Sequence, residues 1–214
     1  MSARSRSREP AGAGRLSADK VVDTALQLIA ERGLEGLTMR GLGLALGVEA
    51  MSLYHWFPAK EHLLDAIADR LIRTVALPPT PAPVGWRPWV MGVARAYRRM
   101  GLAHPRAFPL LAARRFHSPG AFAFIEANIA AHLGAGFDIR RAVRLTRSIG
   151  AFVNGMVMAE VAPQPLTERT GHVPVAELSR LDAGTWAETM RFLRRPSLDG
   201  AFEHGLALLL DGVG

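Results

Sequence analysis

Apolar residues recur at helical spacing along nearly the whole chain, and no segment alternates strictly as a half-buried strand does. The first helix is expected over residues 17–32, where Ser17 can cap the start and Val22, Ala25, Leu26 and Ile29 share one face. The pattern therefore predicts an all-α protein. Further helices are expected over residues 60–75, 88–103, 107–114, 119–133, 139–160, 184–193 and 197–210, with a long loop over 161–183. In the helix at 119–133, Phe122, Ile125 and Ile129 are expected to face inward, and the proline-rich segment at 77–85 marks the expected domain boundary.

Two short helices around a glycine turn are predicted between residues 37 and 58. Thr38 can cap the first helix, and Gly47 ends it because glycine adopts the left-handed conformation at little cost. The second helix is expected over residues 49–56, because proline disfavours helix at the preceding residue and Pro58 follows Phe57. Leu53 and Phe57, four residues apart, are expected to face inward. This plan is that of a helix-turn-helix DNA-binding module.

Outward polar and apolar side chains on this module have the chemistry of a DNA contact. Arg40, Lys60 and the Tyr54 hydroxyl suit phosphate oxygens, whereas serine can bond several base edges and methionine can touch a thymine methyl. The alternative is an ordinary three-helix packing unit whose polar residues are merely solvated. The DNA-binding candidates are Thr38, Arg40, Met51, Ser52, Tyr54, His55 and Lys60.

The charge distribution adds little to the DNA-binding hypothesis. The net charge is +7, but residues 1–77 hold ten basic and nine acidic side chains, whereas residues 78–214 hold sixteen and ten. The excess basicity thus lies outside the helix-turn-helix. Residues 1–15 form a basic arm that is expected to be disordered, either as a solvated tail or as an arm that reaches DNA.

Several protein classes are excluded by composition and motifs. The chain has no cysteine, which rules out disulfides and thiolate metal sites and fits a reducing cytoplasm. No apolar run approaches the ~20 residues that span a bilayer, so no membrane partner is expected. No catalytic signature is present, and the glycines at 41, 43 and 47 lack the spacing of a dinucleotide loop. Neither an enzyme nor a bound metal or cofactor is predicted.

Residues 16–72 resemble the DNA-binding domain of the tetracycline-repressor (TetR) family of bacterial transcriptional regulators. The resemblance rests on the Gly-Leu-Thr start at residues 36–38, the Leu-Gly-Val turn at 46–48, Leu-Tyr-His-Trp-Phe at 53–57 and Lys60 followed by Leu63-Leu64. The rest of the chain resembles the C-terminal domain of the tetracycline-repressor subgroup more loosely. One departure is Glu49, which stands where many members have a capping serine.

The resemblance implies a homodimeric repressor with DNA-binding residues 16–77 and an effector-binding and dimerisation domain over 78–214. The dimer would form on the helices at 139–160 and 197–210, where Gly150, Ala151, Gly155 and Asn154 suit a helix–helix seam, although this surface could instead be intrachain core. Two recognition helices would then enter successive major grooves of a palindromic operator.

The resemblance also implies a ligand pocket in the second domain. The family's metal-binding histidine is absent, because the corresponding pocket positions fall near Val75, Val93 and Leu111. A hydrophobic or aromatic small molecule is therefore expected. His104 and Arg114 could orient a polar group, with a helix cap as the alternative for His104. The ligand-binding candidates are Trp89, Val93, Tyr97, His104, Phe108, Leu111, Arg114, Phe122, Phe152 and Met156.

The expected function is a ligand-responsive, DNA-binding transcriptional repressor in the cytoplasm. Its effector would shift the helix at 60–75 and so change the separation of the recognition helices. An effector-independent DNA-binding protein and an activator remain open alternatives.

Overall fold

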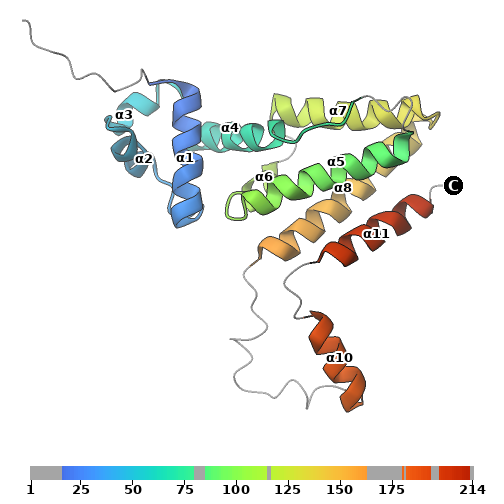
Figure 1. The fold of residues 1–214 in the computed structure, drawn as a ribbon. Helices are drawn as coiled ribbons and strands as arrows, with labels where there is room; N and C mark the ends of the chain where they lie inside the picture. Colours follow the sequence, from blue (N-terminus) through green and yellow to red (C-terminus); the bar gives the residue numbers. More distant parts are fainter. Residues whose placement is uncertain are drawn as a thin grey trace, which may run out of the picture. The chain divides into compact units, whose positions relative to one another are not determined.

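The computed structural model describes residues 16–79, 85–114, 117–162, 180, 182–193 and 198–212. Every regular element among these residues is a helix, as the all-α prediction required (Figure 1). The basic arm at 1–15 and most of the loop expected at 161–183 lie outside the described residues. The helices are α1 Ala18–Arg32, α2 Met39–Leu46, α3 Ala50–Leu53, α4 Lys60–Arg73, α5 Trp86–Ala103, α6 Phe108–Arg114, α7 Pro119–Gly134, α8 Ile139–Val161, α10 Ala183–Leu193 and α11 Asp199–Asp211.

Helix boundaries follow the capping signals of the sequence. Ser17 accepts a hydrogen bond from Lys20 N at the start of α1, and Gly33 ends that helix with φ 77°. Only the second short helix differs clearly from its predicted range, because α3 covers four residues and continues as turns to Trp56. The missing side-chain cap at Glu49 fits this short length.

The chain divides into two compact units, Met1–Leu63 and Leu64–Gly214, and the division falls within α4. The sequence placed the boundary between residues 77 and 78 instead, at a proline-rich segment of which residues 80–84 lie outside the described residues. The part of α4 beyond Leu63 belongs with the second unit, since Asp65 and Asp69 bond to the ends of α6 and α7.

The first unit packs α1 against α2 and α2 against α3. Its centre is made of aliphatic side chains from all three helices and from the loop before α2. The fully buried members include Val21, Ala25, Ile29, Leu37, Leu42 and Leu53. This small core holds the helix-turn-helix in place.

In the second unit, α8 is the central helix, and α5, α6, α7 and α11 all pack against it (Figure 1). The core includes Phe108, Leu111, Val157 and Phe202. The expectation that Phe122 faces inward was wrong, since its side chain is 61% exposed. Helix α7 is apolar around most of its circumference, so that residue spacing alone does not identify its buried face.

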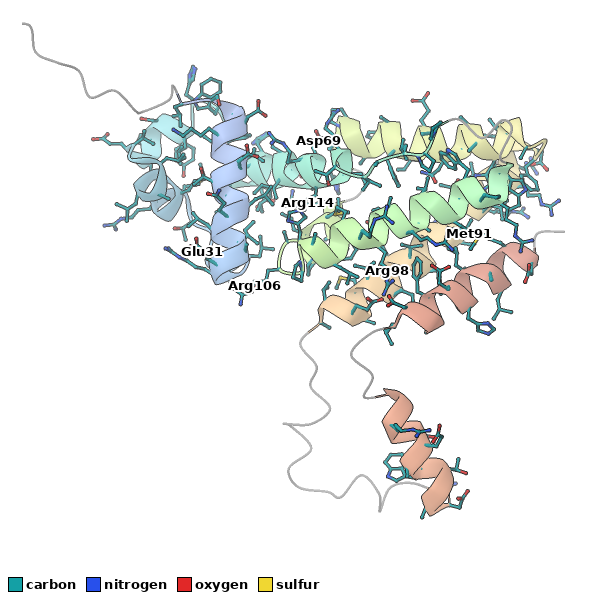
Figure 2. The ribbon with its side chains drawn as sticks, viewed as in Figure 1. Glu31, Asp69, Met91, Arg98, Arg106 and Arg114 are labelled. Carbon is teal, nitrogen blue, oxygen red and sulfur yellow. The ribbon has the colours of Figure 1, made fainter. Side chains whose placement is uncertain are left out.

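Ion pairs attach α11 to the other helices of this unit. The Arg98 guanidinium on α5 donates to both carboxylate oxygens of Glu160 on α8, at 2.9 and 2.8 Å, and pairs with Asp199 on α11 (Figure 2). Arg98 also lies over the Phe202 ring, 4.9 Å from its centroid. Arg98 and Glu160 are largely buried, so this pair joins α5 to α8 away from solvent, whereas Asp199 is 71% exposed and its pair with Arg98 is partly screened by water.

Helices α5 and α8 approach closely at Gly101. A Cβ atom at this position would lie 2.5 Å from Val157 Cγ1 and 2.8 Å from Phe108 Cδ2. We therefore expect Gly101→Ala to lower the free energy of unfolding by ~1–3 kcal/mol, the usual cost of overpacking. Chemical denaturation measures this change.

The matched control is Gly200→Ala on α11, where no heavy atom lies within 4 Å of the added Cβ. Alanine has the better helix propensity, so this variant should be as stable as the parent or more so. A Gly101→Ala protein as stable as Gly200→Ala would contradict the close packing described here.

Candidate DNA-binding surface and ligand cavity

The turn between α2 and α3 brings the two helices together backbone to backbone. Gly47 adopts the left-handed conformation with φ 69° and ψ 30°, as predicted. Val48 N donates to Gly43 O at 2.9 Å. A Cβ at Gly43 would lie 2.9 Å from Val48 O and 3.1 Å from Ala50 N, so only glycine allows this approach. The contact fixes the angle at which α3 leaves α2.

Two of the predicted DNA-binding residues also stabilise the module itself. The Thr38 hydroxyl accepts a hydrogen bond from Gly41 N at 3.0 Å and so caps α2. Lys60 Nζ, at the first residue of α4, donates to Leu37 O at 2.7 Å. This bond ties the start of α4 to the start of α2 and leaves two ammonium hydrogens for a phosphate.

The segment formed by α3 and the following turn has one buried face and one exposed face. Leu53 and Phe57 are buried, as the sequence predicted, and they hold the segment against the core. Met51 is 74% exposed and Tyr54 39% exposed. The remaining candidates all have exposed side chains on α2, α3 and the following turn; these are Arg40, Met51, Ser52, Tyr54 and His55.

Sequence reasoning missed two exposed apolar side chains on this module. Leu44 of α2 is 83% exposed, and Trp56 is 40% exposed with its ring edge-on to His55 at 5.5 Å between centroids. Large apolar side chains are costly to leave in water, so a partner surface that covers them would stabilise the complex. The arrangement as a whole can follow a nucleic-acid groove with both polar and apolar contacts.

The second unit contains a partly open cavity of about 540 Å³. Helices α5, α7 and α8 supply most of its wall, and α4, α6 and the start of α7 close it with Ile72, Leu111 and Ala121. The lining is mainly aliphatic and aromatic, and the polar members are few. They are Tyr97, Asn128, His132, Thr146, Arg147 and Asn154.

Three of the predicted ligand-binding residues line this cavity, namely Val93, Tyr97 and Leu111. The other seven lie elsewhere. Trp89 is buried and its indole N–H donates to Pro78 O at 3.2 Å. His104 is the C-cap residue of α5, which is the alternative role that the sequence suggested for it. Phe108 is fully buried, where it meets Gly101 and the Tyr97 ring.

The remaining four have other neighbours. Arg114 forms an ion pair with Asp65 on α4, and Phe122 points to solvent. Phe152 stacks on Phe202 at 6.0 Å between centroids, and half-buried Met156 does not reach the cavity lining. Apolar character and helical spacing identified the helices of the cavity wall, but not which face of each helix turns toward it.

Most polar residues of the cavity were missed from the sequence. Asn128 and His132 follow Phe124 at four-residue intervals on α7, and this polar stripe beside Ile125 and Ile129 was the available signal. Asn154 was expected at a helix–helix seam between protomers. It is instead buried within the unit, where its Oδ1 accepts a 2.9 Å hydrogen bond from the Tyr97 hydroxyl.

Polar contacts join the second half of α4 to the helices around the cavity. Arg114 Nη1 of α6 lies 2.5 Å from Asp65, and Gly120 N of α7 donates to Asp69 at 2.6 Å (Figure 2). Burial raises the pKa of Asp69, but hydrogen bonds from Arg73, Ser118 and Gly120 together outweigh it and hold the pKa below its ordinary value. Movement of α6 or α7 would therefore pull on α4.

Within the described parts of the chain, no three or more His, Asp or Glu side chains gather where they could hold a metal ion. No helix there is long and apolar enough to cross a bilayer.

Comparison with known proteins decides the family. Residues 21–67 match the family described as bacterial regulatory proteins, tetR family, and residues 78–214 match the tetracyclin repressor-like C-terminal domain. The chain belongs to the TetR family. Members of this family are DNA-binding transcriptional regulators and not enzymes. The helix-turn-helix of α2 and α3 thus lies in the TetR DNA-binding domain, and α5 to α11 make up the TetR C-terminal domain.

Individual TetR proteins match over nearly their whole length. The tetracycline repressor protein class A from transposon 1721 of Escherichia coli is 34% identical over 203 residues, which cover 93% of this chain and 91% of that protein. A possible TetR-family regulator of Streptomyces coelicolor A3(2) superposes with a TM-score of 0.76, at 33% identity and with coverage of 92% and 98%. ActR of Streptomyces coelicolor in complex with actinorhodin gives a TM-score of 0.76, at 25% identity and with coverage of 93% and 97%.

Proposed function

We propose that the protein is a transcriptional repressor that binds a palindromic operator as a homodimer and is released by a small hydrophobic or aromatic effector. One observation carries the proposal. The same chain combines an exposed α2–α3 surface for DNA with a partly open, mainly apolar cavity of about 540 Å³. A cavity of this size and lining suits a small organic ligand. The protein would act in the cytoplasm, on the cell's DNA.

The operator contacts divide by chemistry. Arg40, Lys60 and the Tyr54 hydroxyl would hold phosphates and set the register of the protein on the duplex. Met51 and Ser52 lie on α3, the recognition helix, where they would meet base edges in the major groove. His55 and Thr38 would make additional contacts with the operator DNA beside those of α3.

The dimer would form on α8 and α11. Both helices leave large apolar side chains exposed in the protomer, including Ile139, Met158 and Leu208. Gly155 on α8 is exposed and has no heavy atom within 4 Å of a built Cβ, so a partner helix can approach it closely. Two copies related by a two-fold axis would present recognition helices about 34 Å apart, one turn of DNA.

The effector would occupy the cavity of the second unit. Val93 and Leu111 are apolar, so the two lining positions that correspond to pocket residues of the tetracycline repressor offer no metal ligand, and we propose an effector without a bound metal. The similar protein ActR of Streptomyces coelicolor forms a complex with actinorhodin. A ligand with few polar groups fits the composition of the wall in this chain.

Helix α4 would couple the two sites. Its first residue bonds to the helix-turn-helix through Leu37 O, and Ile72 in its last turn lines the cavity. Asp65 and Asp69 attach it to α6 and α7 between these points. An effector that shifts α6 or α7 would therefore move α4. A typical coupling of ~1–3 kcal/mol lowers operator affinity by about 5- to 150-fold.

Substitution of Tyr54 tests the DNA-binding surface. The side chain is exposed on α3's C-terminal end, so Tyr54→Ala should fold normally and lose about tenfold or more in affinity for specific DNA. Fluorescence anisotropy on DNA from upstream of the protein's own gene, with unrelated DNA as competitor and at two salt concentrations, measures the change.

Phosphate contacts alone also give salt-sensitive binding, and competitor DNA separates the two cases. The control is Glu31→Gln on α1, an exposed side chain outside the candidate surface. Equal affinity of the parent and Tyr54→Ala for specific DNA would contradict the assignment of this face.

A further inference from the structure

Two buried polar atoms in the second unit have no hydrogen-bond partner among the described residues. They are Nε2 of His132 on α7 and Oγ1 of Thr146 on α8. Both residues line the effector cavity. His132 is 1% exposed, so bulk water does not reach its ring freely. Buried polar atoms in proteins are nearly always paired with protein groups or ordered water, so these two atoms are available to the polar groups of a molecule that enters the cavity.

The tautomer of His132 follows from its other nitrogen. Nδ1 lies 2.6 Å from Asn128 O, and a carbonyl oxygen can only accept, so Nδ1 carries the hydrogen. Burial lowers the pKa of His132 below its usual range, which keeps the ring neutral at neutral pH. Nε2 is therefore a hydrogen-bond acceptor. The Nδ1 bond and the nearby Trp86 ring, at 5.6 Å between centroids, hold the imidazole in place.

Thr146 differs from other threonines in the helices of this chain. Thr24 and Thr189 donate their hydroxyls to the carbonyls four residues earlier, each at 2.8 Å, which is the usual way for a helical threonine. The Thr146 hydroxyl makes no such bond. It can both donate and accept, so it can serve a second polar group of a bound molecule.

The charge of the lining restricts the partner further. No aspartate or glutamate lines the cavity, and Arg147 is its one charged lining residue in the described part of the chain. A cation would be desolvated without compensation and would be repelled by the guanidinium. A carboxylate carries no hydrogen to donate to Nε2. A neutral hydroxyl meets the requirement.

We propose that the effector is a mainly apolar molecule with a hydroxyl group that donates a hydrogen bond to Nε2 of His132, while the Thr146 hydroxyl holds a second polar group. The inference rests on the proposed effector site in this cavity. It adds the class of ligand, a phenol or alcohol on an apolar frame, and the two side chains that select it.

Three matched probes test the donor directly on the full-length parent protein. They are 2-hydroxyfluorenone, 2-methoxyfluorenone and fluorenone, which share one rigid tricyclic ketone and differ in a hydroxyl, a methyl ether or neither. Quenching of tryptophan fluorescence gives each dissociation constant. We expect the hydroxyl probe to bind at least tenfold more tightly than the other two. Equal affinities, or no binding by any probe, would overturn the proposal.

Two variants assign the selectivity to residues. In His132→Phe, which keeps a ring but loses the acceptor, the preference for the hydroxyl probe should fall to twofold or less. Thr146→Val keeps the shape and should weaken all three ketone probes by a similar factor, with their ranking unchanged. An undiminished preference for the hydroxyl probe in His132→Phe would overturn the proposal. The proposal would also be overturned if this preference were lost in Arg147→Ala and kept in His132→Phe. Thermal melting checks that each variant folds.

The same samples separate this inference from the proposed function. If the hydroxyl probe binds selectively but leaves operator binding unchanged, the ligand class holds and the coupling fails. If probes release DNA without regard to their hydroxyl, the coupling holds and the role of His132 fails.

Discussion

Replacing Gly43 with alanine should abolish tight operator binding, even though alanine is the better helix former. The added Cβ would lie 2.9 Å from Val48 O and 3.1 Å from Ala50 N, and both are backbone atoms that cannot move independently. Helix α3 must then move away from α2. Overpacking of this kind costs ~1–3 kcal/mol. Since two copies of the module would engage one operator, we expect affinity to fall by more than about 100-fold.

Fluorescence anisotropy with operator DNA measures the loss, and circular dichroism shows whether the helices persist. Gly200→Ala is the control, because it makes the same substitution in a helix with no heavy atom within 4 Å of the new Cβ. The control should bind DNA as the parent does. A Gly43→Ala protein with parental affinity would mean that the close contact between α2 and α3 does not fix the DNA-binding geometry.

Filling the cavity should produce a regulator that binds DNA and no longer responds to its effector. Gly150 on α8 lines the cavity, and a Cβ built there has no heavy atom within 4 Å. Gly150→Phe starts from an unobstructed Cβ position at the wall of the cavity, so its ring should take up part of the space of about 540 Å³. We expect operator affinity within about threefold of the parent and a loss of effector-induced release of at least tenfold.

A size series provides the control. Gly150→Ala adds one methyl group and leaves most of the cavity open, so this variant should still respond. Sedimentation analysis of both variants checks that the oligomeric state is unchanged, since α8 is also part of the proposed dimer surface. Release of DNA from Gly150→Phe at the parental effector concentration would place the effector outside this cavity.

The helices and the DNA-binding surface could be predicted because their signals are local. Thr38 and Gly47 mark the helix ends by their own backbone chemistry, and the structure has them in those roles. The Phe57-Pro58 step does not set the end of α3, which already ends at Leu53. Leu53 and Phe57 face inward at a spacing of four residues. The candidates around them are exposed as a consequence.

The cavity wall was less predictable because it depends on how separate helices face one another. Helix α7 carries apolar residues on most sides, so spacing could not show that Phe122 points outward while Asn128 and His132 turn inward. Arg114 and Phe152 have the chemistry of ligand contacts, but their partners, Asp65 and Phe202, are distant in sequence. Only tertiary structure reveals such pairs.

The central claim is that the cavity of the second unit controls DNA binding by the first. Its most direct test is the affinity of one cavity-binding compound for the free protein and for the protein saturated with operator DNA. Linkage requires the ratio of these affinities to equal the factor by which the compound weakens operator binding. The account predicts at least fivefold weaker binding of the compound to the DNA complex. Equal affinities for the free and DNA-bound protein would contradict it.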